Sequence, residues 1–241
     1  MVELTCGDCF DMMNNMPDNS VDMIMTDPPY KMKYADNVCK SSSYYEFRYS
    51  DKMVVNLNDI LKVGFDLNCF CEHAMRIMKE PNIYVWCNKA QIIDYFNFFV
   101  NDKQLKYEII CWHKSNSLPT YSNKYLTDTE YCLYFHKNVR VHPECYDDAK
   151  TYTVMPVDSQ IGLNIGHPNI KPLGIIERLI RNSSCEGDVV FDPFMGSGTT
   201  GVACKHLNRN FIGCEINPKF YQICEERING AHVKRDDNML F

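Results

Sequence analysis

The chain has 241 residues, of which 45% are hydrophobic, and it carries a formal net charge of −6. This composition supports a full hydrophobic core and excludes a disordered chain, and the length suits one α/β domain or two small ones. The negative charge argues against a protein that coats nucleic acid without specificity, although it is compatible with a local basic face. No apolar run approaches the roughly 20 residues that a membrane span requires. The N-terminus lacks a secretory pattern, so we expect a cytoplasmic protein without a membrane partner.

The first part of the chain alternates short apolar runs with stretches of helical spacing. The strands predicted here cover residues 2–6, 21–26, 83–87, 107–113 and 129–136. The helices predicted here cover residues 9–16, 58–79 and 89–101. Between them, residues 31–56 are polar, rich in tyrosine and without a period, which predicts a long loop. Loops of that length in a compact domain are usually functional.

Regular alternation returns in the last third of the chain, after irregular stretches at 115–128 and 137–166. Helices are predicted at residues 173–180, 199–207 and 218–228, and strands at 189–192 and 211–215. Strands that alternate with helices in this way predict a mostly parallel, doubly wound sheet with helices on both faces. In such sheets ligands bind beyond the carboxyl ends of the strands.

Thirteen cysteines are scattered along the chain, many of them inside strand-like runs. This pattern is typical of small, buried and reduced thiols. The single C-x-x-C pair, Cys6 and Cys9, has no second pair or histidine cluster at the spacing of zinc ligands, so we predict no metal site.

The stretch MIMTDPPY, residues 23–30, places a carboxylate, two prolines and a tyrosine where a buried strand ends. Proline cannot donate to a sheet ladder, so the strand must stop there. Asp-Pro and Pro-Pro are also ordinary turn sequences. Taken alone, the stretch therefore predicts a turn as readily as a site.

A glycine-rich segment, VVFDPFMGSGTTG, covers the strand at 189–192, the loop after it and the start of the next helix. Its glycines spell G-x-G-x-x-G, and Glu215 ends the next strand. This is the pattern of a dinucleotide site, with the acid placed for ribose hydroxyls. However, the carboxylate of Asp192 at the start of the loop would repel a pyrophosphate. A cationic ligand suits it better, so we favour S-adenosylmethionine and keep a dinucleotide-dependent oxidoreductase as the alternative.

The two motifs together, Asp27-Pro28-Pro29-Tyr30 before FDPFMGSGTT, resemble the DNA amino-methyltransferases, and in this order their beta group. The resemblance extends over roughly residues 2–136 and 163–229, including GD at the first strand end and a His-Pro…Lys-Pro segment before the glycine loop. It implies a Rossmann-like sheet of the class I S-adenosylmethionine-dependent methyltransferase type. It also implies a single methyltransferase domain over residues 1–241, with DNA-facing loops at 31–56 and a short target-recognition region at 115–166.

The resemblance also implies roles for individual residues. The catalytic set is Asp27, Pro28, Pro29 and Tyr30, with the Asp27 carboxylate and the Pro28 carbonyl holding the target amino group and Tyr30 stacking on a flipped-out base. The cofactor-binding set is Asp8, Cys9, Asp27, Lys171, Asp192, Phe194, Gly196, Ser197, Gly198, Thr199, Thr200, Glu215, Ile216 and Asn217. Lys31, Lys33, Arg48 and Lys114 are candidate contacts to DNA, and Trp86 and Trp112 are either helpers at the site or core residues.

The expected reaction is methyl transfer to an amino group of double-stranded DNA. Relatives with Asp at the first motif position tend to modify adenine N6, which favours adenine over cytosine N4. Methylation of RNA or of a protein glutamine, and a nucleic-acid-binding protein without catalysis, are the remaining alternatives. A homodimer and a cognate restriction enzyme are further partners that the resemblance leaves open.

Overall fold

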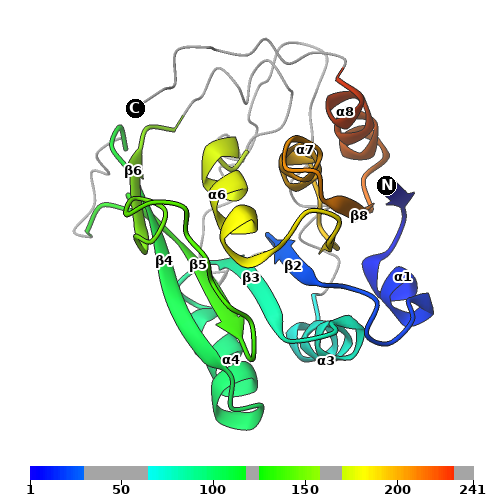
Figure 1. The fold of residues 1–241 in the computed structure, drawn as a ribbon, viewed down its shortest axis with the longest axis horizontal. Coiled ribbons are helices and arrows are strands. Elements are labelled where there is room, and N and C mark those ends of the chain that lie inside the picture. The colour runs from blue at the N-terminus through cyan, green and yellow to red at the C-terminus, as the bar shows by residue number, and fades with distance from the viewer. Residues whose placement is uncertain (30–64, 118–124, 158–169, 231–241) are drawn as a thin grey trace, which may run out of the picture.

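An eight-stranded sheet runs through the middle of the molecule (Figure 1). The computed structural model describes residues 1–29, 65–117, 125–157 and 170–230. The strands are β1 (Val2–Cys6), β2 (Met23–Thr26), β3 (Asn82–Cys87), β4 (Lys106–Lys114), β5 (Thr129–His136), β6 (Tyr152–Met155), β7 (Val189–Asp192) and β8 (Asn210–Glu215). The helices are α1 (Cys9–Asn15), α3 (Leu67–Ile77), α4 (Ile92–Phe96), the π-helix η2 (Asn97–Asp102), α6 (Leu173–Ser183), α7 (Thr199–His206) and α8 (Pro218–Asn229).

The sheet has the strand order β1-β8-β7-β2-β3-β5-β4-β6. Every neighbouring pair is parallel except the two that involve β5. The chain leaves β2 toward β3 and leaves β7 toward β8, so the direction of winding reverses between β2 and β7. In doubly wound sheets such a switch point is where ligands bind. The predicted mostly parallel, doubly wound fold is confirmed, and the end of β2 carries Asp27 while β7 ends at Asp192.

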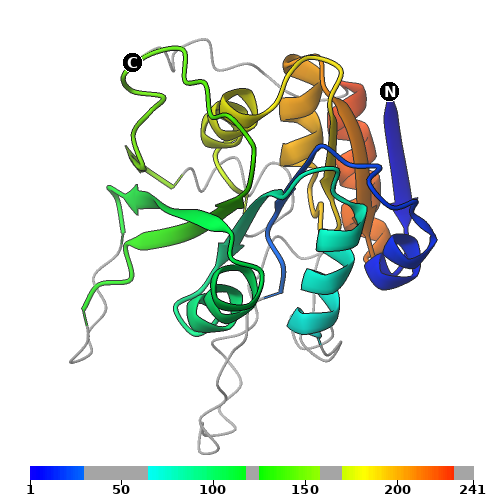
Figure 2. The ribbon, with the colours of Figure 1, turned by 60° about the horizontal axis from the view of Figure 1, so that its bottom comes forward.

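Helices cover both faces of the sheet, and Figure 2 shows α6 and α7 above it with α3 and α4 below it. Alternate residues of each central strand point to the two faces. In β2, Ile24 belongs to the core beneath α1, α3 and η2, whereas Met23 and Met25 belong to the core beneath α6, α7 and α8. In β3, Val85 and Trp86 divide in the same way. These buried strands explain why parallel sheets produce continuous apolar runs in the sequence.

Most predicted elements agree with the structure to within a few residues, and three do not. Residues 137–166 were predicted to be irregular, but β6 forms there as a short edge strand whose side chains alternate between exposed and half-buried positions. The predicted helix at 89–101 divides into α4 and η2. The helix predicted at 58–79 begins only at Leu67, because Asp66 has an extended backbone and caps α3 by accepting from the N–H of Cys69; residues 58–64 lie outside the described part of the chain.

The cysteines behave as small apolar residues in this core. All cysteines in the described residues have free thiols, and seven are buried: Cys9, Cys71, Cys87, Cys132, Cys204, Cys214 and Cys224. Burial raises the pKa of the thiols of Cys87 and Cys214 to about 12. Such thiols are protonated and inert at neutral pH, so the prediction that many of the cysteines are small core residues is confirmed, and their reduced state stays a prediction.

Candidate active site

The carboxyl ends of β2 and β7 are joined by hydrogen bonds to one buried carboxylate. Asp192 is 4% exposed. Its Oδ1 accepts a hydrogen bond from the Thr26 hydroxyl at 2.8 Å, and its Oδ2 accepts one from the Thr200 hydroxyl at 2.7 Å. The backbone N–H of Phe194 also donates to Oδ1. Asp192 therefore connects the end of β2, the glycine loop and the start of α7, and in this structure its carboxylate is engaged by the protein.

Burial raises the pKa of Asp192 to about 7, and the three hydrogen bonds that favour its ionised form only partly oppose this effect. A buried carboxylate loses its hydration, which disfavours the charged form. At neutral pH the Asp192 carboxyl group is therefore ionised to a smaller extent than an exposed aspartate would be.

Asp27 follows β2 directly, and its two oxygens have different surroundings. Its Oδ2 accepts a hydrogen bond from the Lys171 ammonium at 2.5 Å. Its Oδ1 is buried and has no hydrogen-bond partner among the described residues. Buried polar atoms normally have partners, so an oxygen left over at a topological switch point indicates a place for a ligand donor.

The proline corner, Pro28 and Pro29, is held by a residue at the start of the neighbouring helix α4. Gln91, which is 1% exposed, donates a hydrogen bond from its side-chain amide to the carbonyl of Pro29 at 3.1 Å. Its backbone N–H in turn donates to the carbonyl of Asn88 in the turn after β3. The corner is thus fixed on one side by Lys171 and on the other by Gln91.

The glycine loop between β7 and α7 depends on backbone conformations that other residues rarely adopt. Gly196 and Gly198 have φ angles of 51° and 81°. A Cβ on Gly198 would lie 2.4 Å from the sulfur of Cys224, and one on Gly201 would lie 2.3 Å from Ile228. The first glycines therefore shape the loop, and Gly201 permits close packing of α7 against α8.

Glu215 ends β8 beside this loop. Its Oε2 accepts from the backbone N–H of Gly196 at 3.0 Å, and its Oε1 accepts from the N–H of Asn217 at 2.8 Å. Burial raises the pKa of Glu215, while these backbone hydrogen bonds lower it by less. Asn217 caps α8 by accepting from the N–H of Lys219. Ile216, between them, is 50% exposed, so its side chain is accessible at this strand end.

Asp8 lies at the end of the neighbouring strand. The backbone N–H of Gly7 donates to the carbonyl of Glu215, so the ends of β1 and β8 adjoin. Asp8 caps α1 by accepting from the N–H of Phe10 at 2.7 Å, and Cys9 is buried behind it. The predicted cofactor residues at three strand ends, β1, β8 and β7, therefore follow one edge of the sheet.

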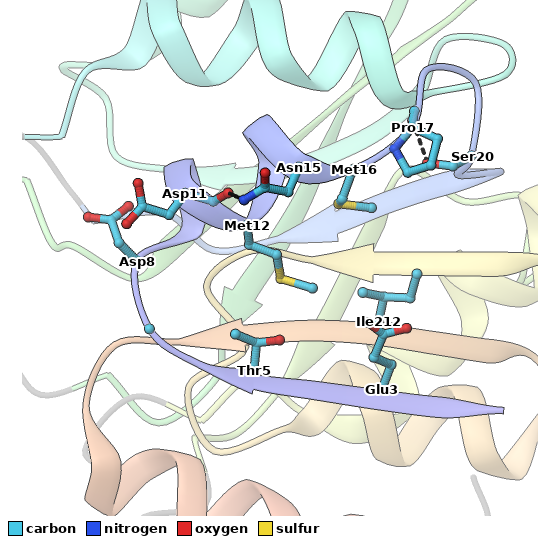
Figure 3. A pocket seen from close by; sticks show the side chains of 11 residues that line it. Glu3, Thr5, Asp8, Asp11, Met12, Asn15, Met16, Pro17, Ser20 and Ile212 are labelled. Atoms are coloured by element: carbon cyan, nitrogen blue, oxygen red, sulfur yellow. Dashed lines mark hydrogen bonds between the residues drawn. The ribbon is translucent and has the colours of Figure 1, made fainter.

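A cavity of about 510 Å³ lies between α1 and the strands β1 and β8 (Figure 3). Asp8 and Asp11 lie toward one of its ends, and Pro17 and Ser20 at the other. Its lining includes Gly7 and Asp8 but none of the residues between β7 and α7. The cavity therefore adjoins the strand-end site without being part of the switch point.

The comparisons with known proteins agree with this geometry. A family model described as DNA methylase matches residues 21–226. The type II methyltransferase M2.MboI of Moraxella bovis is 30% identical over 239 residues, which cover 92% of this chain and 85% of the relative. M2.DpnII of Streptococcus pneumoniae is 31% identical over 253 residues, covering 95% and 90%. The chain belongs to the DNA methylase family.

Solved structures extend the comparison. A crystal structure of the M1.HpyAVI–SAM complex matches the methylase with a TM-score of 0.64 and 26% identity, covering 94% of this chain and 100% of the other. The cytosine-N4-specific PvuII DNA methyltransferase matches with a TM-score of 0.70 at 15% identity, covering 99% and 88%, and this likeness concerns the fold alone. The predicted Rossmann-like fold and DNA methyltransferase family are confirmed.

Several predicted site residues lie outside the described part of the methylase: Tyr30, Lys31, Lys33 and Arg48. Lys114 is described, and its ammonium pairs with Glu130 at 2.5 Å, so it is not a free cation for DNA phosphates in this structure. Trp86 and Trp112 are 1% and 3% exposed, which makes them core residues.

Three residues near the site were not predicted from the sequence. Gln91 and Glu130 contact the proline corner and Lys171, respectively. Arg227 of α8 is 8% exposed and donates from Nη1 to the carbonyl of Ser197 at 2.5 Å and to its hydroxyl at 2.9 Å. The sequence signal for Arg227 is its i+3 spacing from Cys224 on the buried face of an amphipathic helix, where an arginine requires a partner.

Within the described ranges, no group of three or more histidine, cysteine, aspartate or glutamate side chains has the arrangement of a metal site. The same ranges contain no helix long and apolar enough to cross a membrane.

Proposed function

We propose that the methylase transfers a methyl group from S-adenosylmethionine to the N6 amino group of adenine in double-stranded DNA. One observation carries the proposal. Asp27, beside the glycine loop at the switch point, has one carboxylate oxygen held by Lys171 and a second that is buried without a partner among the described residues. A carboxylate oxygen accepts hydrogen bonds, and the amino group of a target base can supply the donor that this oxygen lacks.

The strand-end residues fit the proposed cofactor. Glu215 is half-buried and already positioned by two backbone amides, and ribose hydroxyls are donors that its remaining lone pairs accept. The positive φ angles of Gly196 and Gly198 give the loop backbone a conformation that other residues rarely adopt, and we assign this backbone to the methionine part of the cofactor. We assign Asp8 and Ile216 to contact the adenine ring. When bound, S-adenosylmethionine supplies a methyl group on an electrophilic sulfonium sulfur.

The catalytic task of the protein is to orient the target nitrogen. The lone pair of an exocyclic amino group is conjugated with the base ring and is a poor nucleophile. The Asp27 carboxylate and the Pro28 carbonyl accept its two N–H groups and turn its lone pair out of that conjugation. Because the prolines, Lys171 and Gln91 fix both acceptors in advance, the corner needs little reorganisation. Orientation of this kind contributes several kcal/mol to barrier reduction.

The target base must leave the duplex to reach this corner, because its amino group is inaccessible within the stack. Tyr30, the next residue after the corner, is assigned to stack on the flipped base, a contact worth about 1–3 kcal/mol. The choice of adenine rests on the resemblance, since a carboxylate accepts equally from cytosine N4. The homodimer, the cognate restriction enzyme, the DNA contacts of Lys31, Lys33 and Arg48, and the cytoplasmic location stay predictions.

The test is incubation of the protein with methyl-labelled S-adenosylmethionine and DNA of varied sequence, followed by digestion and mass analysis of the nucleosides. We expect N6-methyladenine. N4-methylcytosine would overturn the choice of base, and the absence of any methylated base across all the DNA would overturn the proposal.

Asp27→Ala tests the residue that carries the proposal. We expect methylation to fall on the order of 100- to 1000-fold, the loss seen when one preorganised transition-state contact is removed. Affinity for S-adenosylmethionine should be largely kept. Asp102→Ala, which removes an exposed carboxylate of η2, is the matched control and should retain full activity. Near-full activity of Asp27→Ala would contradict the assigned role.

A further inference from the structure

Lys171 lies between two carboxylates that come from different strands. Its ammonium is 2.5 Å from Oδ2 of Asp27 and 3.2 Å from Oε2 of Glu130, and its side chain is 9% exposed. The Trp86 ring lies beneath the ammonium, 5.3 Å from the ring centroid. An ammonium buried to this degree is costly unless it is paired, so the two carboxylates and the ring determine where the nitrogen lies.

Glu130 connects this group to a second lysine. The ammonium of Lys114 is 2.5 Å from Oε1 of Glu130 and lies 5.2 Å from the centroid of the Trp112 ring. Glu130 and Trp112 are directly opposed in the register of β5 and β4. Burial raises the pKa of Glu130, but Lys171 and Lys114 together lower it further, so the carboxyl is ionised at neutral pH.

The result is a chain of alternating charges, Asp27, Lys171, Glu130 and Lys114, with no net charge. Only Asp27 borders the switch point. Methyl transfer places positive charge on the target nitrogen, and a nearby negative carboxylate stabilises that charge. An ammonium close to Asp27 weakens this effect, and a second carboxylate on the far side of the ammonium restores it.

We propose that Lys171 and Glu130 are positioning residues of the methyl-transfer reaction. Lys171 holds Oδ2 of Asp27 so that Oδ1 faces the target amino group, and Glu130 holds Lys171 and offsets its charge. This inference rests on the proposed function, and it differs from the sequence-based expectation that Lys171 contacts the cofactor. If Lys171 contacted the cofactor, its substitution would weaken the affinity for S-adenosylmethionine. If Lys171 positions Asp27, its substitution lowers kcat instead.

The experiment compares Lys171→Met, Lys171→Arg, Glu130→Gln and the double variant Lys171→Met/Glu130→Gln. For each, kcat is measured at saturating cofactor and DNA, and the Kd for S-adenosylmethionine is measured by calorimetry. We expect kcat of Lys171→Met and Glu130→Gln to fall roughly 10- to 100-fold, since a misplacement of about 1 Å can cost about 100-fold. The cofactor Kd should change by less than about threefold, because neither residue touches the cofactor in this proposal. Lys171→Arg should recover part of the loss, because it keeps the charge.

The double variant separates positioning from general damage. Because Glu130 acts through Lys171, the loss in the double variant should be clearly smaller than the product of the two single losses. It also keeps the test usable if Lys171→Met fails to fold, since that variant alone leaves Asp27 and Glu130 facing each other without the ammonium between them, and Glu130 with Lys114 as its remaining partner. Thermal unfolding of every variant identifies those that are folded.

Lys103 and Glu72 provide a matched control pair. Lys103 pairs with Glu72 at 3.0 Å and lies over the Phe98 ring, as Lys171 does with Glu130 and Trp86, but on the surface between α3 and η2. Lys103→Met and Glu72→Gln should leave kcat unchanged. A weakened cofactor Kd with unchanged kcat in Lys171→Met, wild-type kcat in Glu130→Gln, or multiplicative losses in the double variant would each overturn the inference. Failure of the proposed function differs from all of these, because the wild type itself would then methylate no base.

Discussion

The glycine loop and the Asp27 corner lie side by side but are held by groups at very different distances along the chain. Gly196 bonds to Glu215, 19 residues away, and Ser197 bonds to Arg227, 30 residues away. Asp27 pairs with Lys171, 144 residues away, and Pro29 with Gln91, 62 residues away. The loop is therefore a local structure made by backbone conformation and close packing, whereas the corner is assembled from side chains that only the complete fold brings together.

This difference predicts how each region fails. Changes to the loop should alter cofactor affinity and stability together, because the loop backbone is part of the core between α7 and α8. Changes around the corner should alter kcat with little effect on cofactor affinity, because the corner holds the target nitrogen.

Gly198→Ala should have the largest effect. The new Cβ lies 2.4 Å from the Cys224 sulfur, and the residue has a positive φ of 81°. We expect a loss of about 2–4 kcal/mol in unfolding free energy, from about 1 kcal/mol of backbone strain and about 1–3 kcal/mol of overpacking. Affinity for S-adenosylmethionine should fall with it. Chemical denaturation and calorimetry measure the two effects.

The matched control for this substitution is Gly187→Ala, which has a positive φ of 85° but nothing within 4 Å of its new Cβ. Its free energy of unfolding should fall only by the backbone strain of about 1 kcal/mol, and its cofactor affinity should be unchanged. Equal losses in the two variants would show that packing against Cys224 does not restrict the loop.

The contrast also explains how far the sequence predicted the molecule. The strands at 2–6 and 189–192 match β1 and β7 residue for residue. β7 is a buried parallel strand with a continuous apolar run, whereas β1 is an exposed edge strand in which apolar and polar residues alternate. β6 was missed because it is a four-residue edge strand with exposed side chains, which carries little hydrophobic signal.

In the site, too, residues that belong to a local sequence pattern were predicted, and residues with distant partners were not. Gly198 and Glu215 were predicted because a glycine loop with an acid at the next strand end is a local pattern. Gln91 and Glu130 were not, since nothing near them in the sequence indicates that their partners are Pro29 and Lys171. Asp192 was predicted as a cofactor residue, and the structure shows its oxygens bonded to two threonine hydroxyls and a backbone amide.

Arg227→Met should have the next largest effect, and it tests the loop from its other side. Arg227 loses its hydrogen bonds to the Ser197 carbonyl and hydroxyl, which leaves a buried carbonyl unsatisfied. We expect a loss of about 1–3 kcal/mol in stability and a weaker cofactor Kd. Arg76→Met is the control, since Arg76 donates to the carbonyls of Met13 and Met16 near α1. It should lose stability without a change in cofactor Kd, and a similar change in Kd in both variants would contradict the role of Arg227.

Gln91→Leu tests the corner. It removes the donor to the Pro29 carbonyl, a bond with a net worth of about 1 kcal/mol. We expect kcat to fall by about fivefold, in proportion to that energy, with an unchanged cofactor Kd. Gln222→Leu on the exposed face of α8, where the amide donates to Glu226, should leave both quantities unchanged. If Gln91→Leu changed only the cofactor Kd, this would contradict the claim that the corner acts on kcat and the loop on cofactor affinity.

A last effect, on the pH dependence of stability, concerns Asp192, which joins the two regions, and its sign is fixed by linkage. Burial raises its pKa from 3.8 to about 7, so between these values the folded protein binds a proton that the unfolded chain has released. Stability therefore falls as pH rises through this window, because stability rises with pH only where the unfolded state binds more protons. Asp192→Asn cannot ionise and should lack this component. Thermal unfolding of both proteins from pH 4.5 to 7.5 should show the wild type losing stability relative to Asp192→Asn as pH rises. A constant difference would mean that Asp192 keeps its charge throughout, and that its bonds to Thr26 and Thr200 compensate fully for burial.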